Sequence, residues 1–171
     1  MGILRKQERS MFTIGDIRNI AIQIEKNGEE TYRRASKAAK NPEVAKVLAW
    51  MAEEEKHHAK WFTNLQSSKP LTPEQQEMEL VGRTLLQEMI KGNPFLLDEN
   101  ELQNAKNVEE VIARSKIFEL DTILFYEFLI GFLDDQEVIE QLRKIIEEER
   151  NHIKQLEHIE DPKNYESLPC R

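Results

Sequence analysis

The sequence predicts an all-α protein, a four-helix bundle in which a long connection joins the second and third helices. Charged residues make up 33% and hydrophobic residues 39% of the 171 positions, with only 6 glycines and 6 prolines. Such a composition suits long amphipathic helices. Apolar residues recur at steps of three and four in four long segments, and the second pair of segments repeats the first pair at an offset of 94 residues. We therefore expect one domain over residues 1–171, with its bundle at about 12–160.

The first two helices have clear start signals. Thr13 is a predicted N-cap, with Asp16 three residues later in the position of a capping box. Asn41 and Pro42 end the first helix and begin the second, because asparagine caps helices well and proline fits the first helical position. The second helix is expected to reach about Gln66.

A connection of about forty residues, 67–106, follows the second helix. Thr72 and Pro73 open an accessory helix within it, and the glycine and proline after Lys91 close that helix. This length is too great for a hairpin between antiparallel neighbours. It predicts a crossover that lets the second and third bundle helices run parallel.

The third helix is expected to start at Asn107 and to be broken by Asp134 and Asp135. The fourth runs from Gln136 to about Ile159. Residues 161–171 contain two prolines and Cys170 and are expected to form an extended tail. The sequence assigns this tail no role.

Acidic residues and histidines interrupt the inward apolar stripes of all four helices. The second helix carries Glu55 and His58 on its stripe, and the fourth carries Glu149 and His152 at the same spacing. Residues three apart share one helix face, so each pair points into the core. A buried carboxylate is costly unless it is paired or bound to a metal. The other two stripes each contain one further glutamate. The resulting six predicted metal ligands are Glu25, Glu55, His58, Glu119, Glu149 and His152.

Four carboxylates and two imidazoles have the composition of a site for two metal ions. Oxygen and imidazole ligands suit iron or manganese better than a thiolate-binding metal. Buried ion pairs with lysine or arginine are the alternative, but no basic residue falls on any inner stripe. We therefore expect two metal ions, of iron, manganese or another divalent metal.

The two Glu-x-x-His pairs are joined by tyrosines seven residues after the lone glutamates, Tyr32 after Glu25 and Tyr126 after Glu119. Over about residues 12–160 this pattern resembles rubrerythrin-like members of the ferritin-like di-iron carboxylate superfamily. The resemblance implies a ferritin-like bundle, a di-iron site and redox chemistry with peroxide or dioxygen. Rubrerythrins typically carry another ligand glutamate where this chain has Thr122. They also usually have a rubredoxin domain, and this chain has no Cys-x-x-Cys motif. Electrons would then come from a separate donor, such as a rubredoxin.

Two other functions stay open. The protein could handle or store iron, with a site that oxidises Fe(II) and passes it on. It could also be a bundle stapled by metal that serves a structural or interaction role. Acidic residues along an iron route would favour the first of these, and a site closed to small molecules would favour the second.

Residues around the ligands also have expected roles. Tyr32 and Tyr126 are expected to hydrogen-bond ligand carboxylates, with plain packing as the alternative. Gly28 and Thr122 are expected to border the pocket for the oxidant, Thr122 donating a hydrogen bond to it; close helix packing is the alternative at Gly28. The resemblance also suggests two crossed acid–histidine pairs. These are Glu54 with His152, and Glu148 with His58.

The charge and apolar runs bear on partners and location. A net charge of −8 argues against nucleic acid or an anionic membrane as partner. The most apolar run, residues 123–133, is too short to span a bilayer, and the first residues contain no apolar signal core. We expect a cytoplasmic homodimer.

Overall fold

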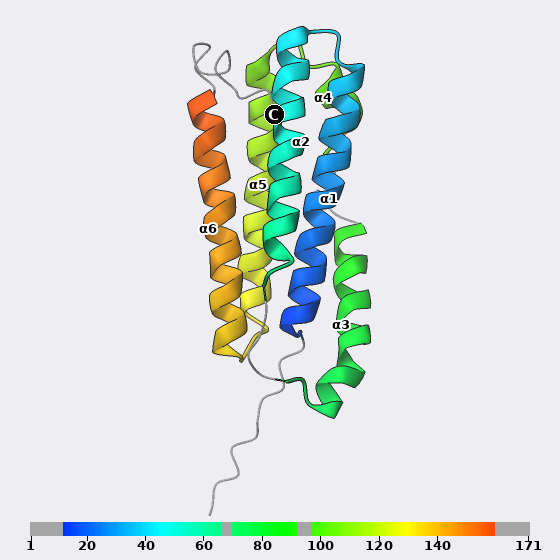
Figure 1. Cartoon of the computed structure of the whole chain (residues 1–171), viewed down its shortest axis with the longest axis vertical. Helices are drawn as coiled ribbons and strands as arrows, with labels where there is room; N and C mark the ends of the chain where they lie inside the picture. Colours follow the sequence, from blue (N-terminus) through cyan, green and yellow to red (C-terminus); the bar gives the residue numbers. More distant parts are fainter. Residues whose placement is uncertain (1–11, 66–69, 92–96, 160–171) are drawn as a thin grey trace, which may run out of the picture.

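The computed structural model describes residues 12–65, 70–91 and 97–159, and the regular elements in these ranges are all helices. Four long helices form the bundle, and two shorter ones belong to the connection (Figure 1). In chain order they are α1 (Ile14–Ala38), α2 (Pro42–Phe62), α3 (Pro73–Lys91), α4 (Glu99–Gln103), α5 (Val108–Ile130) and α6 (Gln136–Ile159). The all-α, ferritin-like bundle predicted from the sequence is confirmed.

The predicted helix starts are confirmed by their caps. The Thr13 hydroxyl accepts from the Asp16 amide at 3.1 Å, and the Asp16 carboxylate accepts from the Thr13 amide at 3.0 Å. Asn41 accepts from the amide of Glu43 at 2.9 Å, and Asn107 accepts from the amide of Glu110 at 3.0 Å. These side chains satisfy amides that have no partner inside the helix.

Two helices end earlier than the sequence predicts. α5 stops at Ile130 instead of continuing to Asp134, because the amides of residues 131–133 bond carbonyls three residues back. These bonds close the last turn more tightly than an α-helix does. α2 likewise stops at Phe62, and the predicted end at Gln66 lies outside the described residues.

The connection spans the length of the bundle. α2 and α5 both run downward in Figure 1, while α1 and α6 run upward, so the predicted parallel arrangement is confirmed. α3 lies beside the first half of α1. α4, a five-residue helix capped by Asp98, was not predicted from the sequence, because one turn is too short to show a period. Among the described residues, no helix is long and apolar enough to span a bilayer.

The core consists of two apolar clusters, one toward each end of the bundle. On α1, Ile24 belongs to one cluster and Tyr32 to the other. On α6, Ile146 and Leu156 are divided in the same way. The inward polar residues lie between these positions on each helix, so a buried polar layer separates the two clusters.

Candidate metal centre

Each bundle helix contributes one carboxylate to the polar layer. Glu25 comes from α1, Glu55 from α2, Glu119 from α5 and Glu149 from α6, and none is more than 1% exposed. Each occupies an inward position between apolar neighbours on its helix, so forming the helix carries the carboxylate into the core. The structure therefore brings together the four acids that the sequence singles out.

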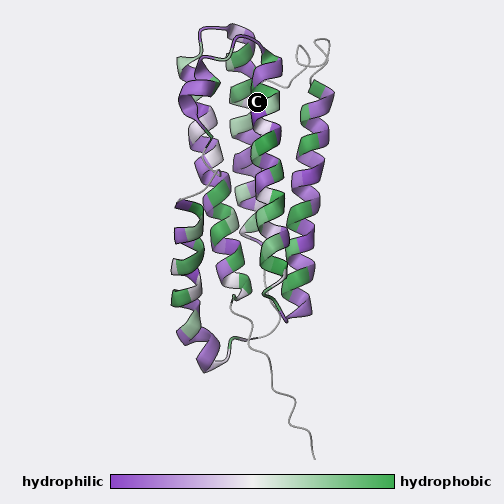
Figure 2. Cartoon of the chain, turned by 180° about the vertical axis from the view of Figure 1, so that it is seen from behind, coloured by the Kyte–Doolittle hydropathy of each residue, from purple (hydrophilic) through white to green (hydrophobic). Residues whose placement is uncertain are grey.

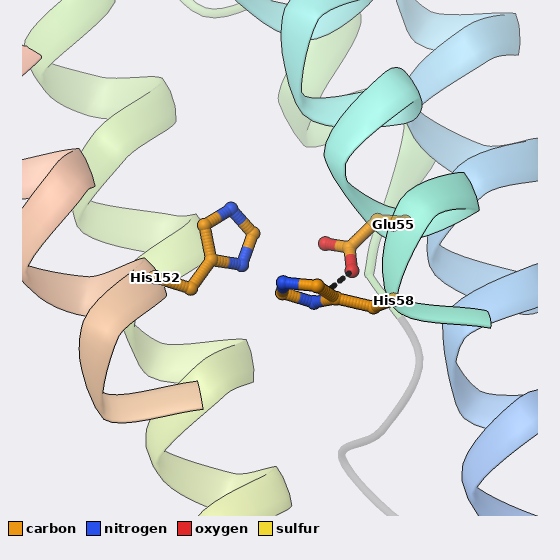
Figure 3. Close-up of side chains that lie close together, drawn as sticks. All are labelled: Glu55, His58 and His152. Carbon is orange, nitrogen blue, oxygen red and sulfur yellow. Dashed lines mark ion pairs between the residues drawn. The ribbon is translucent and has the colours of Figure 1, made fainter. Parts of the chain in front are cut away.

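The two histidines face each other across this layer, one from α2 and one from α6 (Figure 3). Their ring centroids are 5.0 Å apart and the rings are almost perpendicular, at 87°. Nδ1 of His58 lies 3.4 Å from a Glu25 oxygen, 3.8 Å from a Glu55 oxygen and 3.9 Å from a Glu149 oxygen. Nδ1 of His152 lies 2.8 Å from Oε1 of Glu119.

The six side chains form three overlapping groups of possible metal ligands. Within each group, one ligand atom from every residue lies within 4.8 Å of the others. The groups are Glu55, His58 and His152; Glu25, His58 and Glu149; and Glu119, Glu149 and His152. His58, Glu149 and His152 each belong to two groups. This sharing suits neighbouring ions held by common ligands.

Several buried oxygen and nitrogen atoms of this layer that could bind a metal have no hydrogen-bond partner. Both carboxylate oxygens of Glu55 and of Glu149, and both ring nitrogens of His152, are buried without a hydrogen bond. Unpaired buried polar atoms cost free energy, and native proteins contain few of them. Among the described residues, the ion-pair contacts of these four carboxylates are with the two histidines, not with lysine or arginine. The residues therefore fit a pair of metal ions and do not form buried ion pairs with basic side chains.

Burial and mutual repulsion shift the proton affinities of the layer. Burial, then nearby carboxylates, raises the pKa of Glu25, Glu55 and Glu149 well above the usual range. Burial raises the pKa of Glu119 to about 7. Burial, reinforced by His58, lowers the pKa of His152 to about 3. The metal-free protein thus keeps protons on carboxyl groups, and binding of metal would release them.

The two tyrosines lie against this layer without the expected hydrogen bonds. The hydroxyls of Tyr32 and Tyr126 are buried and have no hydrogen-bond partner. Burial, followed by nearby carboxylates, raises the pKa of both phenols, so both stay protonated. Their hydrogen bonds to ligand carboxylates remain a prediction for the metal-bound protein.

Gly28 and Thr122 both make close contacts in the structure, and their place beside a pocket for the oxidant stays a prediction. A methyl group on Gly28 would lie 3.3 Å from Cγ and 3.5 Å from Cδ of Glu55, and 3.6 Å from the ring of Phe118. Gly28 therefore makes room for a ligand side chain, as in the alternative of close helix packing. The Thr122 hydroxyl donates to the Phe118 carbonyl at 2.9 Å, so in this structure its proton is not available to an oxidant.

The crossed acid–histidine pairs are not hydrogen-bonded in the structure. Nδ1 of His152 lies 2.8 Å from Glu119 without the geometry of a hydrogen bond, and Nε2 of His152 and Nδ1 of His58 have no hydrogen-bond partner either. Glu54 is partly exposed, lies 4.0 Å from Nδ1 of His57, and acts on His152 only through its charge, which raises the pKa of that ring. Glu148 is half-buried. Both crossed pairs stay predictions for the metal-bound protein.

Trp50 is a further neighbour of the site, and its position there was not predicted from the sequence. Its ring meets that of His152 edge to face, with centroids 6.0 Å apart. A second unforeseen contact joins Ser115 to Met51, whose sulfur accepts from the hydroxyl at 3.1 Å. Neither contact has a counterpart in the 94-residue repeat, so the repeat gave no signal for them.

Two Glu-x-x-His pairs and two further glutamates at the centre of a four-helix bundle define the class of dinuclear metal-carboxylate proteins. The chain belongs to the rubrerythrin family, whose model matches residues 16–160. That span contains all six candidate ligands. No curated protein and no solved structure is significantly similar to the chain.

Proposed function

We propose that this protein binds two iron ions through Glu25, Glu55, His58, Glu119, Glu149 and His152, and that it reduces peroxide or dioxygen at this site. The observation that carries the proposal is the buried layer of carboxylates and imidazoles without other partners. Membership of the rubrerythrin family supports the same reading. Manganese suits the donor set as well, so the choice of iron rests on the family.

A pair of bound ferrous ions would supply the electrons that the oxidant accepts. The chain would hold the ions and control their surroundings. Glu55 and Glu149 offer two unpartnered oxygens each, so either oxygen of both side chains could bind a metal ion. The apolar clusters above and below the layer exclude water from it. The phenol protons of Tyr32 and Tyr126 remain available for hydrogen bonds to ligand oxygens.

The side of His58 is the route by which a small oxidant would approach. The His58 side chain is 14% exposed, whereas none of the other five ligands is more than 1% exposed. A large substrate would not reach side chains that are buried to this degree. Continued turnover would need an external reductant, and a separate electron donor such as a rubredoxin fits, because the chain contains a single cysteine.

A structural role for the metal is the second candidate. The near-complete burial of the four carboxylates favours it, since a closed site would stabilise the bundle without admitting a reactant. The third candidate, iron handling or storage, requires that Fe(II) be oxidised repeatedly and that the product leave the site or accumulate.

Stopped-flow oxidation of the ferrous protein separates these functions. Protein treated with EDTA is reloaded with Fe(II) without oxygen and mixed with peroxide or with dioxygen. The proposal predicts fast oxidation of about two irons per chain, followed by turnover only when an electron donor is supplied. Retention of iron without oxidation by either reagent would contradict it and favour the structural role. Continued oxidation of Fe(II) far beyond two per chain would favour iron handling.

A further inference from the structure

α5 carries a second apolar stripe on the face that points away from the metal layer. Ile117, Leu120, Leu124 and Phe128 recur at steps of three and four and are 60%, 49%, 61% and 52% exposed. Phe132, in the turn that follows, is 44% exposed. α5 is the central helix of the view from behind, and much of the ribbon facing the viewer there is apolar (Figure 2). We call these five side chains the outer stripe.

The outer stripe is large for a free surface. About half of each of five large side chains is exposed. Since a large side chain presents roughly 150–250 Å², the stripe amounts to on the order of 500 Å² of apolar area. Patches of this size on monomeric proteins are often functional contact sites. A stable interface buries about 800 Å² on each partner, so the stripe would supply the apolar centre of one and its charged neighbours the rim.

We propose that the outer stripe binds the outer stripe of a second copy of this chain, with the two α5 helices antiparallel. In this arrangement a two-fold axis passes between Leu120 and Leu124. Leu120 then faces Leu124 of the second copy, and Ile117 faces Phe128. Closed two-fold contacts of one surface with itself are the commonest form of soluble assembly. An electron donor that binds transiently would need a smaller and more polar surface.

The charges beside the stripe are complementary in this arrangement. Two ion pairs join α5 to α6 along one edge of the stripe, Lys116 with Glu157 at 3.0 Å and Glu127 with Arg150 at 3.0 Å. The two-fold axis places the first ion pair of one copy at the height of the second ion pair of the other copy. Lys116 would therefore lie near Glu127 of the second copy, and Glu157 near Arg150, so opposite charges meet at both places.

A parallel pairing of the same stripes is less favourable. It would bring the Lys116 edge of one copy beside the opposite edge of the other, where Arg114 lies at a similar height on α5. Both cations already have an acidic partner, Lys116 in Glu157 and Arg114 in Glu101, so the parallel pairing would bring like charges together without adding an attraction. The antiparallel pairing has one cost of its own, because the copies of Asp121 lie near the axis. Asp121→Asn is therefore expected to tighten the association.

Sedimentation velocity of the full-length, metal-reconstituted chain over a range of concentrations tests this proposal. Leu124→Glu places a charge in the centre of the interface and should weaken association by at least about tenfold. Val81→Glu is the matched control, because Val81 is 58% exposed on α3, away from the outer stripe. Wild type and Val81→Glu should sediment as dimers, and Leu124→Glu as a monomer at the same concentration. A monomeric wild type, a dimeric Leu124→Glu, or equal dissociation of both variants would overturn the proposal.

Cross-linking tests the orientation of the two copies. In a Cys170→Ser background, single cysteines replace Leu124 or the exposed Ala113. With a rise of 1.5 Å per residue, the antiparallel pairing separates the two copies of position 124 by about 5 Å along the axis and those of position 113 by about 28 Å. A short bismaleimide should therefore link Leu124→Cys and not Ala113→Cys. Efficient linking through position 113 would contradict the antiparallel arrangement.

Discussion

Removing the charge of Glu119 should stabilise the metal-free protein at alkaline pH and change it little at acidic pH. Glu119 is 1% exposed, and burial raises its pKa from 4.5 to about 7. Glutamine has the shape of the protonated side chain and cannot ionise. Glu119→Gln therefore replaces a group whose ionisation opposes folding with one that stays neutral at every pH.

The size of this stabilisation follows from the pKa of Glu119 in the unfolded chain and in the folded protein. The carboxyl group ionises around pH 4.5 in the unfolded chain and around pH 7 in the folded protein, so the folded protein binds more protons between these values. The free energy of unfolding of the wild type therefore falls as the pH rises through this window. One pKa unit corresponds to about 1.4 kcal/mol, so the cost of an ionised Glu119 is about 3 kcal/mol at pH 8. It is under about 1 kcal/mol at pH 5, where the folded carboxyl is still protonated.

Urea denaturation of EDTA-treated wild type and Glu119→Gln at pH 5 and pH 8 measures this difference. The variant should be more stable by about 3 kcal/mol at pH 8, or by about 6–12 °C in Tm for a chain of this size. The two proteins should nearly coincide at pH 5. A variant less stable than wild type at pH 8, or a difference of the same size at both values, would refute the assigned burial cost. With metal present the order should reverse, because the variant lacks a ligand.

Three further predictions concern single residues of the layer. Gly28→Ala should weaken metal binding in a competition titration, because its new methyl group would press on Glu55 at 3.3 Å; unchanged affinity would contradict this. Tyr32→Phe removes a buried hydroxyl without a partner and should stabilise the EDTA-treated protein by about 1 kcal/mol or more in urea melts, whereas a loss of stability would reveal a bond formed by that hydroxyl. His152→Gln should make the metal-free protein less sensitive to acid. Because the pKa of His152 falls from 6.5 to about 3 on folding, the unfolded chain binds more protons below pH 6.5, and about 2 kcal/mol of wild-type stability is lost by pH 5; parallel pH profiles of the two proteins would refute this cause.

The positions of the six candidate ligands could be predicted because helical period and burial chemistry agree on them. Glu55 and His58 fall on the apolar stripe of α2, and the repeat supplies the same pair on α6. An inward apolar stripe predicts that a residue faces the core, but it does not predict the distance to the facing helix. Gly28 shows this limit, because its role depends on the approach of Glu55. Thr122 shows another, since a threonine hydroxyl in any helix can bond the carbonyl four residues back.

The outer stripe and α4 were missed for different reasons. One apolar face was predicted for each helix, and α5 has two. Residues 123–133 were considered only as a membrane span, although Leu124, Phe128 and Phe132 belong to the exposed face. α4 depends on a local cap, in which Asp98 accepts from the amides of Asn100 and Glu101. Such a cap gives no periodic signal over one turn.

The most direct test of the dinuclear site is the metal content of three proteins loaded with Fe(II) under anaerobic conditions and then desalted. The first is the wild type, and the second carries Glu55→Ala and Glu149→Ala. The third carries Glu53→Ala and Glu147→Ala, which make the same chemical change two residues earlier on the same two helices, at side chains 25% and 56% exposed. We predict about two irons per chain in the wild type and in the third protein, and almost none in the second. Equal iron in all three proteins, or no iron retained by the wild type, would contradict the assignment of the buried layer as a metal centre.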